Sequence, residues 1–229
     1  MTFEILPNDI LMFSDGNQVI LVTSGIPVSQ SRGLSFNFMG RNFSCNNTFT
    51  RLDRISSIIG RKIDVMMGLD IIKQFDLIID FKNRSLDITF ADEDSNFGVD
   101  FPICHPLSID SLGYIEIPVK VEGSEFNLIF DTIAKFSYLD PKVTSSFKPS
   151  GSEKVYHSTL GYFDTFIYDL STNIGDIELR TSFGNLPLQI EVLLRMAGIK
   201  GVIGSTLLKN FKIGLSISQS KIFLKPYIL

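Results

Sequence analysis

Residues 20–29 read ILVTSGIPVS, and residues 128–137 read LIFDTIAKFS. An apolar run precedes the polar residues of each stretch, as in a buried strand that ends at a polar loop. The two stretches align at an offset of 108 residues. Three residue pairs define the alignment: Thr23 with Asp131, Ser24 with Thr132, and Gly25 with Ile133. A sequence that repeats itself in this way predicts two similar structural units in one chain.

A second pair of related stretches lies further along the chain. Residues 66–75 read MMGLDIIKQF, and residues 202–211 read VIGSTLLKNF, which aligns Gly68 with Gly204. Each stretch is followed by alternating apolar residues that predict a β-hairpin. The offset of 136 residues is larger than that of the first pair, so the second unit carries an insertion. Short helices are predicted on both sides of these glycines, at residues 52–59, 71–75, 189–197 and 207–211.

Together, the two pairs of stretches resemble the sequence motifs of the aspartic proteases. In this superfamily of pepsin-like and retropepsin-like proteins, an apolar-apolar-Asp-Thr/Ser-Gly motif is followed by an apolar-apolar-Gly element. The resemblance implies a mainly β fold with short helices, in which two acid-protease-like units related by a pseudo-twofold axis form a small bilobal protein. We expect retropepsin-like units at residues 1–92 and 99–229, in a tandem form with degenerate motifs.

The motif positions imply a candidate site that lacks one of its two acids. Aspartic proteases use two carboxylates that share one proton, because like charges so close together cannot both ionise. Asp131 keeps the acid position of the second motif, whereas Thr23 replaces the partner acid of the first. A hydroxyl can hydrogen-bond a carboxylate but cannot act as the second acid–base group near neutral pH. From their matching motif positions, we expect Thr23 and Asp131 to face each other near the pseudo-twofold axis. Because the second acid is missing, we expect the chain to have no peptidase activity.

The other motif residues indicate that the architecture persisted after the chemistry lapsed. Ser24 and Thr132 match the hydroxyl residues that, in the family, brace the two loops against each other. Ile133 stands where the family has glycine, and a β-branched residue resists conformations that glycine allows. We expect Ile133 to push its loop away or to crowd the water site. The retained motif glycines are Gly25, Gly68 and Gly204.

Two functions from different classes stay open. In the first, the chain is a non-catalytic aspartic-protease-like protein that binds an extended peptide or a protein client in a cleft between its units by strand addition. In the alternative, it is an active aspartic-type endopeptidase that uses Asp131 alone or paired with a second copy. We expect a monomer, because two paired units already satisfy the axis. Three tyrosines of the insertion form either a flap over the cleft or a plain β-hairpin: Tyr156, Tyr162 and Tyr168.

Composition and charge exclude other classes of function. The 229 residues carry a net charge of −4 with no basic run, so no nucleic-acid partner is expected. No apolar run reaches the roughly 20 residues of a membrane span, and the N-terminus does not resemble a signal peptide, which together predict a cytoplasmic protein without a membrane partner. The residues Cys104-His105, Cys45 and His157 lack the spacing of zinc ligands, so we expect neither a metal nor another cofactor. The two cysteines are expected to be thiols in a reducing compartment, with a disulfide between the units as the alternative.

Overall fold

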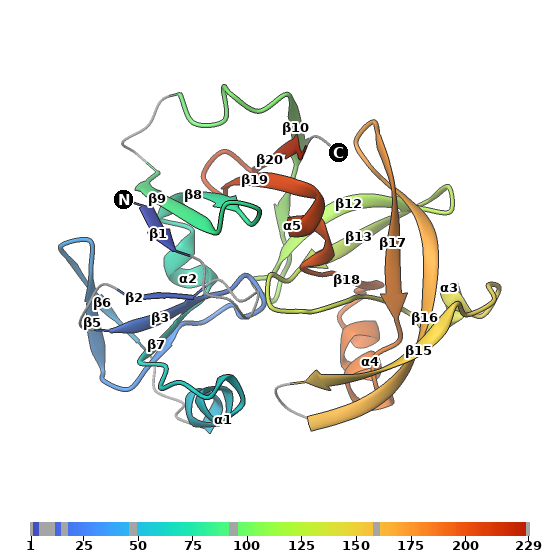
Figure 1. The fold of residues 1–229 in the computed structure, drawn as a ribbon, viewed down its shortest axis with the longest axis horizontal. Helices are drawn as coiled ribbons and strands as arrows, with labels where there is room; N and C mark the ends of the chain where they lie inside the picture. Colours follow the sequence, from blue (N-terminus) through green and yellow to red (C-terminus); the bar gives the residue numbers. More distant parts are fainter. Residues whose placement is uncertain are drawn as a thin grey trace.

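The computed structural model describes residues 2–4, 12–14, 18–45, 50–91, 96–157 and 161–227 of the chain. Within these residues, most of the regular structure is strand, and the helices are few and short (Figure 1). The strands form several sheets, of which the three largest position the candidate site. The prediction of a mainly β protein with short helices is therefore confirmed.

A four-stranded sheet belongs entirely to the first unit. Its strands, in spatial order, are β2 (Met12–Ser14), β3 (Val19–Val22), β7 (Val65–Met67) and β4 (Gln30–Ser31). Both faces of β3 are buried, since Ile20 and Val22 pack in the main core and Leu21 packs in a second apolar cluster. Helix α1 (Thr50–Ile59) contributes Leu52 and Ile55 to that second cluster. A separate hairpin of β5 (Ser35–Phe38) and β6 (Arg41–Ser44) adds aromatic side chains to the main core.

An eight-stranded sheet belongs entirely to the second unit. The strands in spatial order are β11 (Ser108–Ile109), β12 (Ile115–Val121), β13 (Ser124–Phe130), β18 (Gly201–Ile203), β14 (Ser137–Leu139), β17 (Ile177–Gly184), β16 (Gly161–Ile174) and β15 (Gly151–His157). Helix α3 (Pro141–Thr144) follows β14, and helix α4 (Leu188–Met196) precedes β18. The predicted insertion of the second unit therefore holds the long β15–β16–β17 meander (Figure 1).

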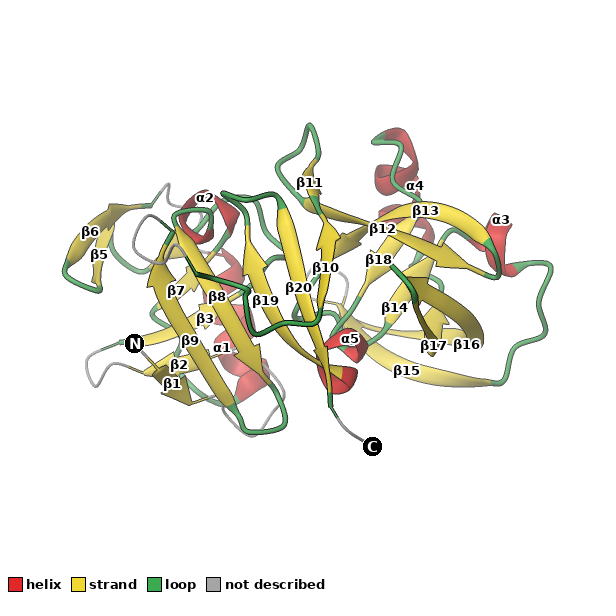
Figure 2. Cartoon of the chain, turned by 90° about the horizontal axis from the view of Figure 1, so that it is seen from above, coloured by secondary structure: helices red, strands yellow, loops and turns green. Residues whose placement is uncertain are grey.

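A six-stranded sheet joins the two units. Figure 2 shows its strands side by side in the middle of the molecule. Their order is β1 (Thr2–Glu4), β9 (Ser85–Phe90), β8 (Phe75–Asp80), β19 (Phe211–Ser216), β20 (Lys221–Pro226) and β10 (Ile103–Pro106). At its centre, β8 and β19 run antiparallel with Ile78 opposite Gly214. These two residues are each other's equivalents at the 136-residue offset, and a twofold axis between the units would give this register.

The parallel strand pairs of the two units have matching registers. In the first unit Leu21 pairs with Met66, and in the second Ile129 pairs with Val202. Ile129 is the equivalent of Leu21 at the 108-residue offset, and Val202 is the equivalent of Met66 at the 136-residue offset. The helices α2 (Leu69–Ile72) and α5 (Thr206–Asn210) then lead into β8 and β19. Helix α2 is shorter than the predicted 71–75 segment, because Phe75 already begins a core strand.

The main apolar core is shared between the units. One cluster of buried side chains includes Ile79 and Leu86 of the first unit together with Phe130 and Leu215 of the second. Separating the units would expose these apolar side chains to water, at a cost of about 25 cal/mol per Å² of apolar surface. The six-stranded sheet is therefore the structural centre of the molecule.

Candidate active-site loops between the two units

The two motif loops begin at the ends of parallel strand pairs. The backbone N–H of Thr23 donates to the carbonyl of Met67 at 3.1 Å, and that of Asp131 donates to the carbonyl of Ile203 at 3.0 Å. Each motif residue therefore extends its strand by one last ladder bond, before the chain turns away. The two candidate site positions are held by equivalent backbone bonds.

Gly68 and Gly204 lie where the backbone of the motif loop passes close to the following strand end. The Gly68 N–H donates to the Ser29 hydroxyl at 2.7 Å, and the Gly204 N–H donates to the Ser137 hydroxyl at 3.0 Å. A Cβ at Gly204 would lie 2.3 Å from the carbonyl oxygen of Phe136, far inside van der Waals contact. In each unit, the motif loop, which carries Thr23 or Asp131, packs directly on this glycine. A larger residue would keep the loop from packing there.

Two hydroxyl residues join the loops directly. The Ser24 N–H donates to Thr132 Oγ1 at 3.3 Å, and the Thr132 N–H donates to Ser24 Oγ at 3.2 Å. The Ser24 hydroxyl donates in turn to the carbonyl of Phe130 at 2.6 Å. Both side chains are buried, so these reciprocal bonds form away from competing water. The loops are thus locked together across the boundary between the units.

The Asp131 carboxyl is crowded by the opposite loop. A Cβ built on Gly25 would lie 2.3 Å from Asp131 Oδ1 and 2.6 Å from Oδ2, so the Gly25 backbone rests against the carboxyl group. Burial raises the pKa of Asp131 to about 6, although the N–H groups of Ile133 and Ala134 lower it in part. The bond from the Ile133 N–H to Oδ1 measures 3.0 Å. Asp131 as a whole residue is half-buried, but its carboxyl oxygens lie against the opposite loop, and this burial is the cause of the raised pKa.

Thr23 is fully buried in the equivalent place of the first loop. Its Oγ1 accepts the Gly25 N–H at 2.9 Å, which mirrors the bond from the Ile133 N–H to Asp131. The hydroxyl thus takes over the local role of a carboxylate oxygen. Among the residues that the structure describes, no direct hydrogen bond joins Thr23 to Asp131. The two residues lie in loops that touch through Gly25 and through the Ser24–Thr132 bonds.

The side chain of Ile133 has a packing partner in the opposite unit. Its side chain is partly buried against the second apolar cluster, which is built entirely by the first unit. The members of that cluster are Met12, Leu21, Ile26, Leu52, Ile55, Ile63 and Met66. The β-branched side chain of Ile133 therefore bridges the two units.

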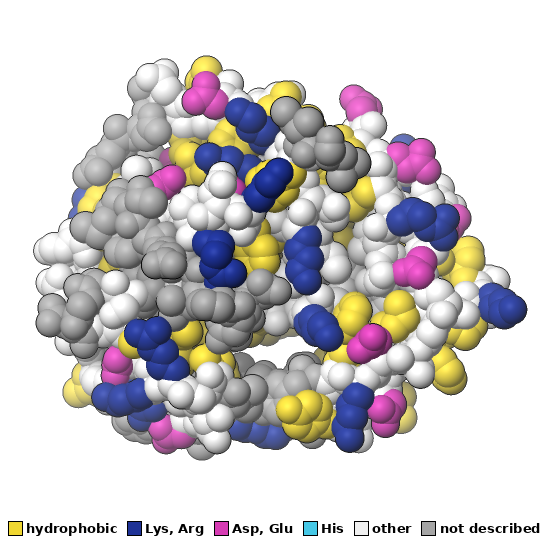
Figure 3. Space-filling model, viewed as in Figure 1, with side chains coloured by type: hydrophobic (Ala, Val, Ile, Leu, Met, Phe, Trp, Pro, Cys, Tyr) yellow, Lys and Arg dark blue, Asp and Glu magenta, His cyan; other side chains and the backbone are white. Residues whose placement is uncertain are grey.

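The three tyrosines of the insertion have different places. Tyr168 is buried in the main core, so it is not a residue of an exposed flap. Tyr162 is exposed on β16 and stands opposite Tyr156 of β15, whose side chain lies outside the described residues. A Cβ on Gly161 would lie 3.5 Å from a guanidinium nitrogen of Arg54 on α1, so the hairpin reaches the first unit. Figure 3 shows an opening between the units, in the region between α1 and α4 of Figure 1.

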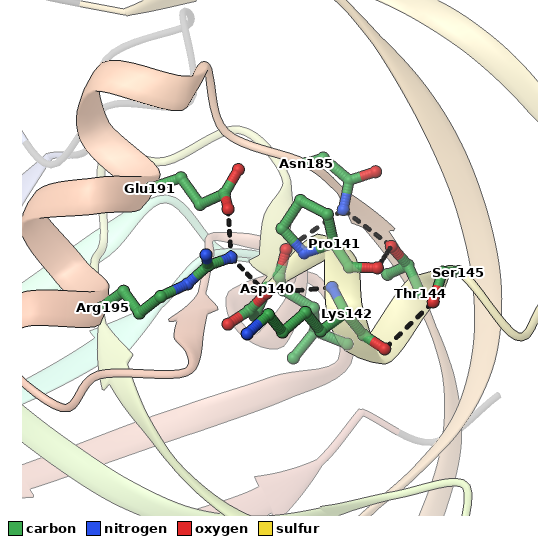
Figure 4. Close-up of polar contacts among 9 residues, drawn as sticks. Asp140, Pro141, Lys142, Thr144, Ser145, Asn185, Glu191 and Arg195 are labelled. Atoms are coloured by element: carbon green, nitrogen blue, oxygen red, sulfur yellow. Dashed lines mark hydrogen bonds and ion pairs between the residues drawn. The ribbon is translucent and has the colours of Figure 1, made fainter.

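A polar network beside this region was not predicted from the sequence. Asp140 accepts the Lys142 N–H at 2.9 Å and pairs with Arg195 of α4 at 2.9 Å (Figure 4). Arg195 also contacts Glu191, one helical turn earlier. Although burial alone would raise the pKa of Asp140, its hydrogen bonds and the charges of Arg195 and Lys200 hold it below the ordinary value. The network fastens α4 to the end of β14.

In the first unit an ion pair also anchors the helix, α1, but the acid and the base have exchanged places. Arg32 follows β4 at the position equivalent to Asp140, and its Nη1 pairs with Asp53 of α1 at 2.7 Å. In the second unit the acid is on the strand and the base is on the helix. The one sequence signal for this network is the i, i+4 spacing of Glu191 and Arg195, which marks a helix face.

No described group of side chains is suited to hold a metal ion. Within the described ranges, no cluster of three His, Cys, Asp or Glu residues occurs. The His105 Nε2 lies 2.7 Å from the carbonyl of Pro118, which gives that ring a structural partner. Cys45 is a buried free thiol and Cys104 is an exposed one, so the alternative of a disulfide between the units is wrong. No described helix has the length and apolar character that crossing a bilayer requires.

Comparisons with known proteins give weak matches. No protein-family model matches the chain, and no curated protein matches it. Among solved structures, it is similar to the protease of simian foamy virus (mac), with 11% identity and a TM-score of 0.28 over 35% of this chain and 94% of the viral chain. It is also similar to a retropepsin-like aspartic protease from Rickettsia conorii, with 15% identity and a TM-score of 0.36 over 53% of this chain and 88% of that one. TM-scores below 0.5 support no conclusion about activity.

Proposed function

We propose that this chain is a tandem aspartic-protease-like protein that binds an extended segment of a client protein between its two units and does not cleave it. The repeated motifs, the matching registers and the paired loops support this reading. The proposal includes a monomeric cytoplasmic protein in which the two units take the place of the two subunits of a dimeric protease.

The observation that carries the proposal is the state of Thr23. Peptide hydrolysis by this fold needs one ionised and one protonated carboxyl group in the same site. Thr23 is buried, and its oxygen already accepts the Gly25 N–H. The hydroxyl cannot take the proton that a general base must remove from water near neutral pH. Asp131 therefore lacks a partner acid on the opposite loop.

The surroundings of the loops support binding of an extended chain. The hairpin of β15 and β16 crosses from the second unit to Arg54 of the first, and an opening lies between the units (Figure 3). In the second unit, Phe136 and Phe163 are partly buried against an apolar cluster that includes Tyr138. An extended segment in such a place gains backbone hydrogen bonds from the strands and contacts for alternate side chains.

A paired assay tests the two halves of the proposal. Casein and a labelled peptide library are incubated with the protein from pH 3 to pH 8, with and without pepstatin. We expect no cleavage, but retention of a subset of peptides by both the natural chain and the Asp131→Asn variant. Cleavage that pepstatin blocks and that Asp131→Asn abolishes would show an active endopeptidase.

The endopeptidase is the second candidate function, and one observation favours it. A carboxyl group with a pKa of about 6 is poised to exchange a proton near neutral pH. It would work alone or with Asp131 of a second copy. The concentration dependence of any cleavage separates these two forms, because a site shared between copies is lost on dilution.

A further inference from the structure

Helix α4 presents an apolar face to solvent. None of its nine residues is buried, although five are large apolar residues and a sixth is methionine. The exposed fractions are 66% for Leu188, 41% for Val192, 62% for Leu193 and 82% for Met196. By contrast, the equivalent helix of the first unit, α1, buries Leu52 and Ile55 in a cluster. Contiguous exposed apolar side chains of this kind mark a site of protein contact.

A hollow adjoins α4 on the side of the candidate site. Leu194 of α4, Leu186 and Ile199 supply apolar lining beside Tyr138, whereas Asp140, Glu191 and Lys200 supply charged lining. The burial of Tyr138 and the nearby charge of Asp131 raise the pKa of its phenol to about 12, so the phenol stays neutral.

The charges next to α4 are predominantly positive. Arg195 is shared between Asp140 and Glu191 (Figure 4). Lys142 and Lys200 flank Asp140, and neither takes part in an ion pair within the described part of the chain. Beside α4 itself, three cations stand next to the two carboxylates of Asp140 and Glu191, and a further carboxyl group, that of Asp131, lies near Tyr138. The whole chain has a net charge of −4. This local excess favours a partner that carries carboxylates.

We propose that the α4 surface, made of the exposed apolar residues of α4 with Lys142 and Lys200, docks a partner segment that combines apolar side chains with carboxylates. The inference rests on the proposed function, because α4 lies beside the opening between the units and the docked segment is the continuation of the client bound there (Figures 1 and 3). The apolar residues supply affinity, and the lysines select acidic over basic clients.

Fluorescence anisotropy with three labelled peptides tests the composition of the partner. One peptide combines Leu with Glu, the second combines Leu with Lys, and the third combines Ser with Glu. We expect the Leu–Glu peptide to bind at least roughly tenfold more tightly than either of the others, since loss of a central apolar contact or reversal of charge has effects of that size. Equal binding of the Leu–Glu and Leu–Lys peptides overturns the charge argument.

Variants of exposed residues locate the peptide without disturbing the core. The double variant Leu193→Ser with Met196→Ser should weaken binding roughly tenfold, and Lys200→Glu should weaken it more at low salt than at high salt. The matched controls are Val99→Ser, which is 77% exposed outside the α4 surface, and Lys221→Glu on β20. Loss of affinity in the controls that equals the loss in the α4 variants contradicts the proposal.

Hydrogen exchange separates this inference from the proposed function. Protection of residues 188–200 together with residues 131–137 supports both. Protection of residues 131–137 alone, with unchanged affinity of the α4 variants, overturns the docking inference and leaves the proposed function standing. Protection of residues 188–200 alone contradicts binding between the units. A concentration-dependent dimer that Leu193→Ser abolishes would show that a second copy covers the helix, which overturns the partner proposed here.

Discussion

Replacement of Asp131 by asparagine should make the folded protein more stable at neutral pH. Burial raises the pKa of Asp131 to about 6, from 3.8 for an ordinary aspartate. The folded chain therefore binds this proton more tightly than the unfolded chain does. Stability falls as the pH rises from about 4 through about 6, because the unfolded carboxyl ionises first. The amide side chain of the Asp131→Asn variant carries no charge and would remove this dependence.

The size of the effect follows from the shift. A pKa difference of about two corresponds to about 3 kcal/mol of unfolding free energy, since a difference of one corresponds to about 1.36 kcal/mol. Asp131 is half-buried, so solvent screening reduces this to about 1–3 kcal/mol. The Ile133 N–H, which now donates to Oδ1 at 3.0 Å, can donate equally to the amide oxygen of the substituted side chain. The local turn therefore survives the substitution.

Urea unfolding from pH 4 to pH 8 measures this prediction. The free energy of unfolding of the Asp131→Asn variant, relative to the natural chain, should rise by about 1–3 kcal/mol between pH 4 and pH 8. Asp80→Asn is a control of opposite sign. Although burial tends to raise its pKa, bonds from Asn83 and Tyr227 and the charge of Lys212 hold it below the ordinary value. Asp80 therefore stabilises the fold above pH 4 and loses that contribution as the pH falls. A pH-independent difference for Asp131→Asn would refute the reasoning.

Three further predictions concern the loops and the shared core. Gly25→Ala should destabilise the fold by about 1–3 kcal/mol, because its Cβ would overlap the Asp131 carboxyl; thermal unfolding should show most of this loss relieved in the double variant with Asp131→Ala. Residues 1–92 expressed alone should give no cooperative thermal transition, since β8 would lose its pairing with β19 and its share of the common core; a sharp transition contradicts this. The Thr23→Asp variant should unfold at a lower temperature than the double variant Thr23→Asp with Ile133→Gly. NMR titration of the double variant should show the two coupled steps of a carboxyl pair, whereas Asp131 of the natural chain should titrate in one step.

The sequence predicted the features that local repetition can determine. The offset of 108 residues paired Ser24 with Thr132, and the structure joins these two residues by reciprocal bonds. The offset of 136 residues paired Gly68 with Gly204, and both N–H groups donate to equivalent serines. Similar short sequences make similar backbone bonds, so alignment of the chain with itself was sufficient here.

Features that depend on contacts between distant segments were not predicted. The burial of Tyr168 follows from the length of β16, which runs from the hairpin into the core, and spacing alone did not reveal it. The ion pair of Asp140 with Arg195 joins residues that are far apart in sequence. Its counterpart in the first unit exchanges the two charges, so no repeat of residue type pointed to it. The exposure of α4 likewise depends on what packs beside it.

The two departures from the motif compensate each other across the boundary between the units. Gly25 lies against the Asp131 carboxyl, so a glycine is required in the loop that faces an acid. From the equivalence of the two loops, we infer that position 133 lies against position 23 in the same way. Thr23 is shorter than aspartate by one bond and presents a methyl group, which an isoleucine can cover without desolvating a charge. Ile133 then gains contact with the apolar cluster of the first unit. An isoleucine beside a threonine avoids burying a second charge, so we expect a carboxylate at position 23 to be unfavourable while Ile133 is present.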